Sequence, residues 1–273
     1  MTGTRPFYYT YDLESQRCLR SPRSLWGSSP TTSPQSLSTH AFSPDGTLLA
    51  VAGRRGALTV LSWGAAGAST VVAELKTGRT GGIRDLVFAR GGRELWTLSG
   101  DGGEVDCWDL AERRVVRRWK DDGGFGGVKL AIGSDGTCAV GYVFSTELHA
   151  DSRSTTGIVN LYSSSLATSS APQLSLQNPE TPTPTRTIGN LTTAISTLSF
   201  NHDNQLLLIG SKAKKDAFKM IHVPTGTAFS NWPTSGTPLG HVHAAETSAR
   251  GEYMAIGNQR GKVLLYSLKH WLD

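Results

Sequence analysis

The stretch from Arg84 to Asp109 constrains the fold most strongly, because it holds three short strand patterns separated by two tight turns. Apolar and polar residues alternate in these patterns, which is typical of half-buried strands. The turns at 90–92 and 101–102 contain glycines, which tolerate the positive φ angles of tight hairpins. Strands this short and this closely connected predict a small antiparallel sheet that cannot bury both of its faces alone.

The same unit recurs at 40–63, 129–162, 196–223 and 243–268. Corresponding apolar positions lie about 40 to 70 residues apart, and the longer intervals hold Ser/Pro/Thr-rich insertions. A period of about 40 to 45 residues with four strands per unit is typical of β-propellers, in which neighbouring sheets cover one another's faces. The sequence therefore predicts an all-β propeller.

We expect a single domain over 1–273 with about five recognisable blades. The expected blades lie near 40–75, 83–119, 128–170, 188–233 and 240–271, with an orphan strand at 6–13 and mobile inserts at 27–39, 143–156 and 163–187.

Two alternatives exist for closing the ring. The last predicted blade has no outer strand of its own, and in closed propellers an N-terminal segment often supplies that strand. Five blades and the orphan strand at 6–13 would then form a small ring. Alternatively, the chain is a fragment of a seven-bladed ring truncated at its N-terminus, and Met1 is not the true start. We favour the fragment, because 6–13 has the character of a third strand rather than of a lone closing strand.

Composition agrees with a propeller and excludes other classes. Only 18% of the residues are charged and 31 are glycines, which suits many short strands with tight turns. No run approaches the ~18 apolar residues of a membrane helix, and the first ten residues lack the apolar core of a signal peptide. Cys18, Cys107 and Cys138 are widely spaced and odd in number, so we expect reduced thiols in a soluble intracellular protein.

The sequence contains no catalytic constellation. Nucleophile-elbow, phosphate-loop and zinc-protease motifs are absent, and the glycine pairs fall in predicted hairpin turns. Among seven histidines only His241 and His243 have a metal-ligand spacing, and a structural pair is favoured because no third ligand is apparent. We therefore predict no enzymatic activity, no cofactor, no metal, no membrane contact and no small-molecule substrate.

A basic loop is the best candidate for a binding site. The net charge is +5, which is compatible with a nucleic-acid-rich environment. Lys212, Lys214 and Lys215 lie in a predicted turn, where they could contact RNA or an acidic protein through charge alone. A solvated charge run is the more common explanation of such a pattern.

Four arginines mark the predicted outer strand of the second blade. Arg113, Arg114, Arg117 and Arg118 alternate in pairs with apolar residues. A solvated edge strand, protected by charge from pairing with other chains, is favoured over phosphate binding.

The turn at 99–102 and the closing Trp108-Asp109 resemble a WD40 repeat, the unit of one family of propeller blades. In that repeat a serine, an aspartate and a tryptophan share hydrogen bonds inside the blade, so Ser99, Asp101 and Trp108 are predicted to be structural. The fourth member is usually a histidine before the first strand, and Gly81-Gly82 stand in its place here. We therefore expect this blade to be less rigid than one with the full set.

The C-terminal third carries a more specific resemblance. Segments 190–193 (NLTT), 229–233 (FSNWP) and 253–261 (YMAIGNQRG) do not belong to a generic WD40 consensus. They resemble the WD-repeat family known as U-three small nucleolar RNA-associated protein eighteen. The resemblance runs from about residue 7 to residue 271 and is weakest in the Ser/Pro/Thr-rich inserts.

The resemblance implies a non-enzymatic scaffold subunit of the small-subunit processome, within the tandem-propeller subcomplex called UtpB. It implies a nuclear, nucleolar ribonucleoprotein component that supports ribosomal RNA processing and ribosome biogenesis. The implied partners are other UtpB propeller subunits, pre-ribosomal RNA and the U-three small nucleolar RNA, contacted directly or indirectly. Family members also carry an acidic N-terminal extension with a motif that recruits the exosome helicase, which this sequence lacks, so exosome recruitment does not carry over.

A generic WD40 adaptor is the alternative function, for example a substrate receptor of a ubiquitin ligase or a signalling scaffold. It would predict cytoplasmic partners and no association with RNA. An enzyme on a propeller scaffold ranks last, because the chain offers only scattered histidines for its central channel.

Overall fold

A computed structural model describes eleven stretches of the chain. They are residues 7–12, 14–21, 37–53, 56–64, 67–76, 82–100, 103–123, 127–146, 154–168, 181–234 and 236–268. Strands dominate these residues, and the helical pieces in them are the short helix α1 (Ser165–Thr168) and the 3-10 turn η2 (Arg90–Gly92). Within the same stretches no helix is long and apolar enough to cross a membrane.

The chain divides after Trp119 into two compact units. The first comprises residues 1–119 with 173–179, and the second comprises 120–172 with 180–273. The single domain expected from the sequence stays a prediction, as does the seven-bladed ring.

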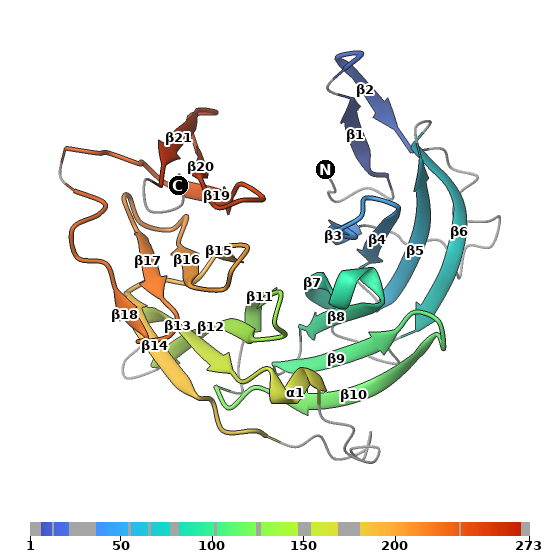
Figure 1. Ribbon diagram of the computed structural model, residues 1–273, viewed down its shortest axis with the longest axis horizontal. Helices are drawn as coiled ribbons and strands as arrows, with labels where there is room; N and C mark the ends of the chain where they lie inside the picture. Colours follow the sequence, from blue (N-terminus) through green and yellow to red (C-terminus); the bar gives the residue numbers. More distant parts are fainter. Residues whose placement is uncertain are drawn as a thin grey trace. The chain divides into compact units, whose positions relative to one another are not determined.

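The first unit holds a hairpin and two four-stranded antiparallel sheets (Figure 1). The hairpin pairs β1 (Tyr9–Asp12) with β2 (Arg17–Arg20). The first sheet comprises β3 (Leu37–Phe42), β4 (Leu48–Gly53), β5 (Ala57–Gly64) and β6 (Gly67–Lys76) in sequence order. The second comprises β7 (Ile83–Ala89), β8 (Glu94–Ser99), β9 (Glu104–Asp109) and β10 (Arg114–Lys120), also in sequence order.

The second unit holds three more antiparallel sheets. The third sheet comprises β11 (Gly127–Ile132), β12 (Cys138–Thr146), β13 (Ser154–Tyr162) and β14 (Arg186–Leu191). The fourth comprises β15 (Thr197–Phe200), β16 (Leu206–Gly210), β17 (Phe218–His222) and β18 (Thr227–Ala228). The fifth has three strands, β19 (Val242–Thr247), β20 (Tyr253–Asn258) and β21 (Val263–Ser267).

In the first, second and fourth sheets the second strand is the most deeply buried element. All six residues of β8 and all five of β16 are buried, as are the last five of β4. A strand that buries side chains on both of its faces needs a covering layer on each side of the sheet. Apolar runs such as LLAVAG and LLLIG, rather than strict alternation, are the sequence form of that burial. This is the environment of a propeller blade, and the all-β, WD40-type class predicted from the sequence is confirmed.

Four sheets share one turn between their first and second strands. In each, a backbone N–H donates to the carbonyl three residues earlier, from a residue with φ between 59° and 90°. The bonded pairs are Gly46 with Ser43, Gly136 with Gly133, Asn204 with Asn201, and Gly251 with Ser248, at 2.8 to 3.2 Å. Glycine and asparagine are the residues that accept this left-handed conformation most readily, so the sequence repeat is a repeat of turn chemistry.

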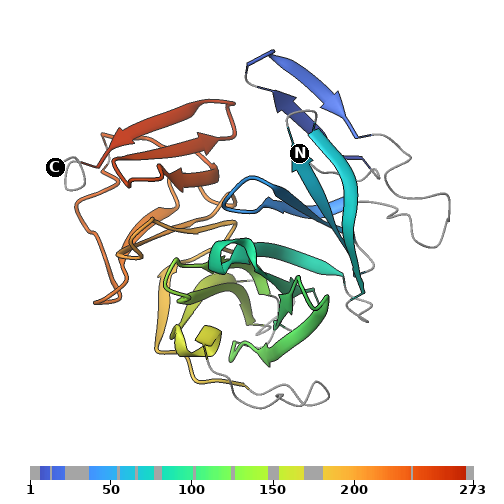
Figure 2. The same cartoon turned by 45° about the vertical axis from the view of Figure 1, so that its right-hand side comes forward.

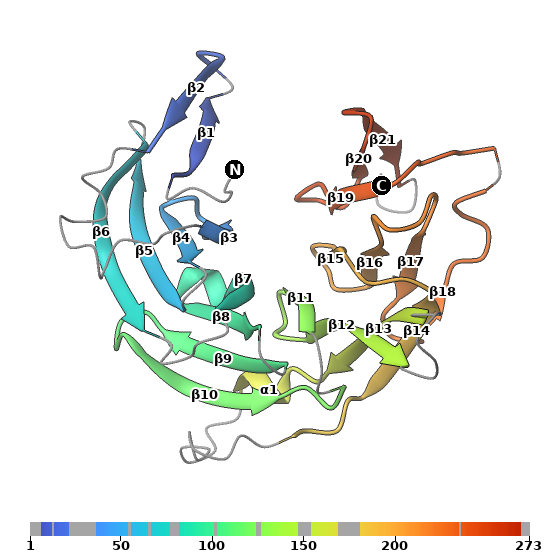
Figure 3. The ribbon, with the colours of Figure 1, turned by 180° about the vertical axis from the view of Figure 1, so that it is seen from behind.

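The core of each unit lies between the faces of consecutive sheets. In the first unit the first and second sheets enclose a cluster that contains Leu58, Phe88 and Trp108. In the second unit one apolar cluster joins the third and fourth sheets, and another joins the fourth and fifth sheets. The fourth and fifth sheets lie side by side in Figure 2. Tyr8, which precedes the hairpin, packs in one cluster with Leu49 of the first sheet. Figure 3 shows the hairpin of β1 and β2 next to the first sheet.

Two element boundaries differ from those expected. Within the segment expected to be an orphan strand at 6–13, Tyr9–Asp12 form β1, which pairs with β2 in a hairpin. The expected fourth blade begins at 188, but residues 186–191 form β14 and pair with β13, so they complete the third sheet instead. The long separation of β14 from β13 hid this pairing, because hydrogen bonds between distant segments leave no local sequence signal.

The predicted inserts fall mostly outside the described residues. Of the insert at 27–39 only 37–39 are described, and they open β3. The insert at 143–156 is shorter than expected, because β12 extends to Thr146 and β13 begins at Ser154. In the insert at 163–187, described residues form α1 and the start of β14.

Candidate nucleic-acid interface

The lysine loop connects β16 to β17 and presents its three lysines to solvent. Lys212, Lys214 and Lys215 are all exposed, and none forms an ion pair with another described residue. The backbone of the loop is nevertheless held in place. The Lys212 N–H donates to Ser196 Oγ at 2.8 Å, and the Lys212 carbonyl lies 2.9 Å from Nδ1 of His241. A carbonyl can only accept, so that ring nitrogen carries the proton.

Asp216 closes the lysine loop against the segment that leads into β19. Its carboxylate Oδ1 accepts the N–H groups of Leu239 and Gly240, both at 2.8 Å. Its own N–H donates to the Gly240 carbonyl at 2.8 Å, and its φ of 57° turns the chain back towards β17. The single acidic side chain of the loop is therefore engaged by backbone donors, and within the described residues it forms no ion pair with the neighbouring lysines.

The predicted structural set of the second sheet is only partly as expected. Trp108 is buried, and its indole Nε1 donates to Thr97 Oγ1 at 3.1 Å. Ser99 is also buried, but its hydroxyl has no hydrogen-bond partner within the described residues. Asp101 lies outside them. The partner of Trp108 is thus Thr97, which the sequence analysis missed.

Strand register explains why Thr97, and not Ser99, accepts the hydrogen bond of the Trp108 indole. Trp108 is paired with Leu95, and Thr97 is paired with Asp106, so Thr97 is the diagonal neighbour of Trp108 on the same face. Ser99 lies two residues further along β8, about 7 Å away along the strand, which is beyond reach of the indole. Register was the signal that would have identified Thr97, and it was not available from the turn motif alone.

Two of the four arginines on and before β10 point into the sheet. Arg117 is 9% exposed, and its guanidinium lies 3.0 Å from Glu94 Oε1. Glu94 also accepts from the indole of Trp96 at 3.2 Å, and the guanidinium lies 5.6 Å from the centre of that ring. Burial raises the pKa of the adjacent Cys107 thiol to about 12, so it is held as a neutral thiol.

Arg118 forms a forked ion pair on the opposite face, with Nε 2.6 Å and NH2 3.2 Å from the two carboxylate oxygens of Asp106. Arg113 and Arg114 match the expected solvated edge. Both are exposed, and Arg114 pairs with Glu112 where both side chains are more than half exposed. The prediction of a solvated arginine strand is therefore wrong for Arg117 and Arg118. Both faces of this sheet are covered, so cations on either face must be paired internally.

A buried polar network anchors the segment after β10 to the third sheet. Asp121 is 1% exposed and accepts from Tyr162 Oη at 2.5 Å and from Asn160 Nδ2 at 3.1 Å. The Asp122 N–H in turn donates to Tyr162 Oη at 3.0 Å. Burial raises the pKa of the Asp121 carboxyl, although its donors oppose the shift. The network is fully enclosed, so its role is to hold the backbone at 121–123.

The two histidines of the predicted pair lie in different surroundings. His241 precedes β19 and faces Lys212, while His243 lies at a register shift between Val242 and Ala244. The regular alternation that would bring both rings to one side is interrupted there. In the part of the chain that the structure describes, no three His, Cys, Asp or Glu side chains are grouped as metal ligands.

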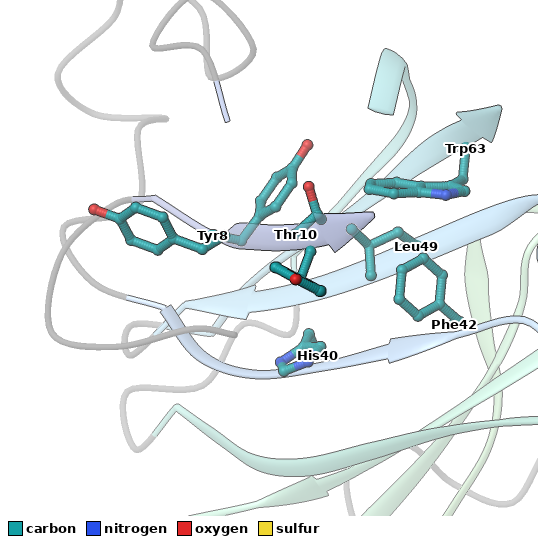
Figure 4. A pocket seen from close by; sticks show the side chains of 8 residues that line it. Tyr8, Thr10, His40, Phe42, Leu49 and Trp63 are labelled. Atoms are coloured by element: carbon teal, nitrogen blue, oxygen red, sulfur yellow. The ribbon is translucent and has the colours of Figure 1, made fainter. Parts of the chain in front are cut away.

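The first unit contains an aromatic pocket of about 320 Å³ between β1 and the first sheet (Figure 4). Trp63 packs edge-on against Phe42, with ring centres 5.0 Å apart. The pocket is lined by Tyr8, Tyr9, Thr10, Tyr11, His40, Phe42, Leu49 and Trp63. Aromatic side chains make up most of this lining.

Sequence comparison connects these features to known proteins. No protein-family model matches the chain. A curated protein of Saccharomyces cerevisiae is 40% identical over 174 residues, which are 62% of this chain and 28% of the relative. A human relative is 31% identical over 232 residues, covering 85% of this chain and 37% of its own length. One from Arabidopsis thaliana is 30% identical over 271 residues, covering 99% of this chain and 44% of its own length.

All three relatives carry the same name. The chain is similar to U3 small nucleolar RNA-associated protein 18. It spans less than half the length of these curated relatives, so the similarity concerns one part of U3 small nucleolar RNA-associated protein 18. The match to the Arabidopsis homolog covers both structural units, and with them the lysine loop of the fourth sheet.

Proposed function

We propose that this protein takes part in ribosomal RNA processing and ribosome biogenesis in the nucleolus, in association with the U3 small nucleolar RNA. The observation that carries the proposal is the similarity to U3 small nucleolar RNA-associated protein 18 in yeast, human and plant, at 30 to 40% identity. The name of those relatives states an association with a nucleolar RNA, and the proposal extends it to this chain.

The proposed role is that of a non-enzymatic scaffold. Its sheets supply edges and exposed turns for contacts with other macromolecules, as propeller blades generally do. We propose that its protein partners are the propeller subunits of the UtpB subcomplex within the small-subunit processome. The exposed, uncompensated lysines at 212–215 support direct contact with RNA, because lysines without acidic partners bind phosphate as point charges.

Affinity purification of the tagged protein from its own cells tests this function. The purification is done at moderate salt, and the co-purifying RNA is probed for U3 small nucleolar RNA and for unprocessed small-subunit precursor. We expect both RNAs, together with other propeller subunits. An unrelated, similarly tagged WD40 protein is the matched control for non-specific recovery.

Recovery of a ubiquitin-ligase or signalling complex, with neither RNA above the control, would refute the proposed function. The generic WD40 adaptor would then be the better description. Depletion of the protein gives an independent readout, since accumulation of unprocessed small-subunit precursor is expected only for a processing factor.

A further inference from the structure

The lysine loop is continuous with a second basic turn. The turn between β20 and β21 exposes Arg260 and Lys262, and neither forms an ion pair with another described residue. The segment at 239–241, which Asp216 anchors to the lysine loop, also contacts this second turn. The His241 carbonyl accepts the N–H of Gln259 at 3.1 Å.

A second bond fixes the same junction. The Asn258 side chain donates from Nδ2 to the Leu239 carbonyl at 3.1 Å, while its Oδ1 accepts the N–H groups of Arg260 at 3.0 Å and Lys262 at 3.3 Å. One short segment, 239–241, therefore holds both basic turns beside each other. We name the exposed cations of the two turns the basic strip, which consists of Lys212, Lys214, Lys215, Arg260 and Lys262.

Strand topology separates the basic strip from the acidic side chains of the fourth and fifth sheets. In an antiparallel sheet the turn after the first strand and the turn after the second lie at opposite ends. The basic strip occupies the turns after the second strands, β16 and β20. Asp203 and Glu252 occupy the turns after the first strands, β15 and β19, and Glu246 lies within β19.

The formal charge at the two ends differs. Residues 181–268 contain four acidic side chains, and Asp216 is the one that lies in the turns of the basic strip. Five cations and this carboxylate leave a formal +4 there. At the opposite end, Asp203 and Glu252 are balanced by Arg250 and by Arg186, which donates to the Pro224 carbonyl in the turn after β17, so the formal charge there is 0. Asp216 is engaged by two backbone N–H groups and, among the described residues, forms no ion pair with these cations, so the strip faces solvent as a net positive surface.

We propose that the basic strip binds the sugar-phosphate backbone of RNA without reading its sequence. The proposal rests on the proposed function and deepens it by assigning the surface. Protein–protein interfaces are anchored by buried apolar and aromatic side chains. The two turns of the strip offer Ala213, Gln259 and Gly261 between their cations, and no aromatic residue on which a base or an apolar anchor could stack. Within the two turns the contacts available are those of charge, and the phosphates of a nucleic-acid backbone are bound by such contacts without readout of sequence.

The number of cations sets the expected salt dependence. Each phosphate contact on a single strand contributes about −0.7 to the slope of log K against log salt. Five contacts predict a slope of about −3.5, and each contact contributes about fivefold in affinity at ~0.1 M salt relative to 1 M. These values belong to the five residues of the strip and do not depend on the nucleotide sequence.

The test is fluorescence anisotropy with the full 273-residue chain and a labelled mixed-sequence single-stranded RNA. Affinity is measured between about 50 and 200 mM KCl. Two double variants, Lys214→Ala/Lys215→Ala and Arg260→Ala/Lys262→Ala, are each expected to flatten the slope by about 1.4, from two lost contacts. Their melting temperatures should equal that of the unchanged protein, because all four side chains are exposed.

Arg250→Ala is the matched control, compared with Arg260→Ala. Both remove one exposed arginine from a turn of the fifth sheet, but at opposite ends of the strands. Arg260→Ala should flatten the slope by about 0.7, and Arg250→Ala should leave it unchanged. Equal effects of the two would overturn the strip, as would an unchanged slope in Arg260→Ala/Lys262→Ala. Stronger binding to polyglutamate than to RNA would also overturn it, because an acidic protein would then be the partner.

The proposed function and the proposed role of the basic strip can be refuted independently of each other. If the unchanged protein recovers U3 small nucleolar RNA from cells while the strip variants bind RNA in vitro with unchanged slopes, the strip is wrong and the proposed function stands. If the unchanged protein recovers no U3 small nucleolar RNA, the proposed function is wrong whatever the strip binds in vitro.

Discussion

The hydrogen bond between Trp108 and Thr97 allows a sharp test of how the second sheet is held together. Trp108 is 3% exposed and packs in one cluster with Phe88 and Leu95. Thr97→Val removes the acceptor of its indole N–H while nearly conserving volume. Ser99→Ala removes a hydroxyl that is buried without a partner in the described residues. The two substitutions are matched in strand and burial, and they differ only in whether a bond is lost.

The expected magnitudes differ clearly. Thr97→Val leaves a buried N–H unpaired, which costs about 1 to 3 kcal/mol. Ser99→Ala removes an unsatisfied polar atom, so its effect should lie within about 0.5 kcal/mol of zero or stabilise slightly. Trp108→Ala removes the whole buried indole and should cost about 3 to 5 kcal/mol. At ~2 to 4 °C per kcal/mol, that loss lowers the melting temperature by about 6 to 20 °C.

Urea denaturation followed by circular dichroism measures these differences, with thermal melting as a second readout. A double-mutant cycle of Trp108→Phe with Thr97→Val isolates the bond itself, and we expect a coupling free energy of about 1 kcal/mol. A costly Ser99→Ala beside a neutral Thr97→Val would refute this account, because Ser99 would then be the partner of the indole. An unchanged melting temperature in Trp108→Ala would refute the placement of Trp108 in the core.

Three further predictions concern other parts of the two units. Arg117→Ala should lower the free energy of unfolding by about 3 to 5 kcal/mol, because it leaves a buried carboxylate unpaired, whereas Arg114→Ala should lower it by at most about 1 kcal/mol. Equal losses of the two variants in urea denaturation would contradict this. Gly157→Ala should destabilise the protein by about 1 to 3 kcal/mol or more, because the added Cβ would meet a backbone carbonyl. A Cβ added at Gly189 would meet open space, so Gly189→Ala should leave the melting temperature unchanged. Burial raises the folded-state pKa of Asp121, so protonated Asp121 contributes stability that is fully present below pH ~4 and is lost as pH rises through the folded pKa. The denaturation midpoint of Asp121→Asn should therefore rise relative to that of the unchanged protein as pH increases above ~4, and a difference that stays constant with pH would contradict this.

Local sequence patterns determined the elements of this protein. The turn between first and second strands depends on residues that accept a left-handed backbone, and Gly46, Gly136 and Gly251 supply it where the sequence repeat placed it. Apolar runs bounded by such turns determined the short buried strands. Because these signals lie within a few residues of one another, the repeat, the blade-type sheets and the class of fold could be read directly.

Contacts between distant residues could not be read in this way. The sequence predicted Arg117 to be solvated, and only the packing of both sheet faces shows that Glu94, 23 residues away, compensates it. The pairing of β14 with β13 crosses a long connection for the same reason. The bond from Trp108 to Thr97 depends on strand register, which fixes which of two similar hydroxyls lies within reach.

The candidate binding site was likewise only partly predictable from the sequence. The sequence by itself determined that Lys212, Lys214 and Lys215 are clustered, because neighbours in a turn are neighbours in space. Tertiary structure alone decided that Arg260 and Lys262 join them, since hydrogen bonds through residues 239–241 bring two turns nearly fifty residues apart to the same end of adjacent sheets. The electrostatic potential at a surface sums the charges that are close in space, whatever their separation along the chain. The extent of a binding surface is therefore a property of the fold.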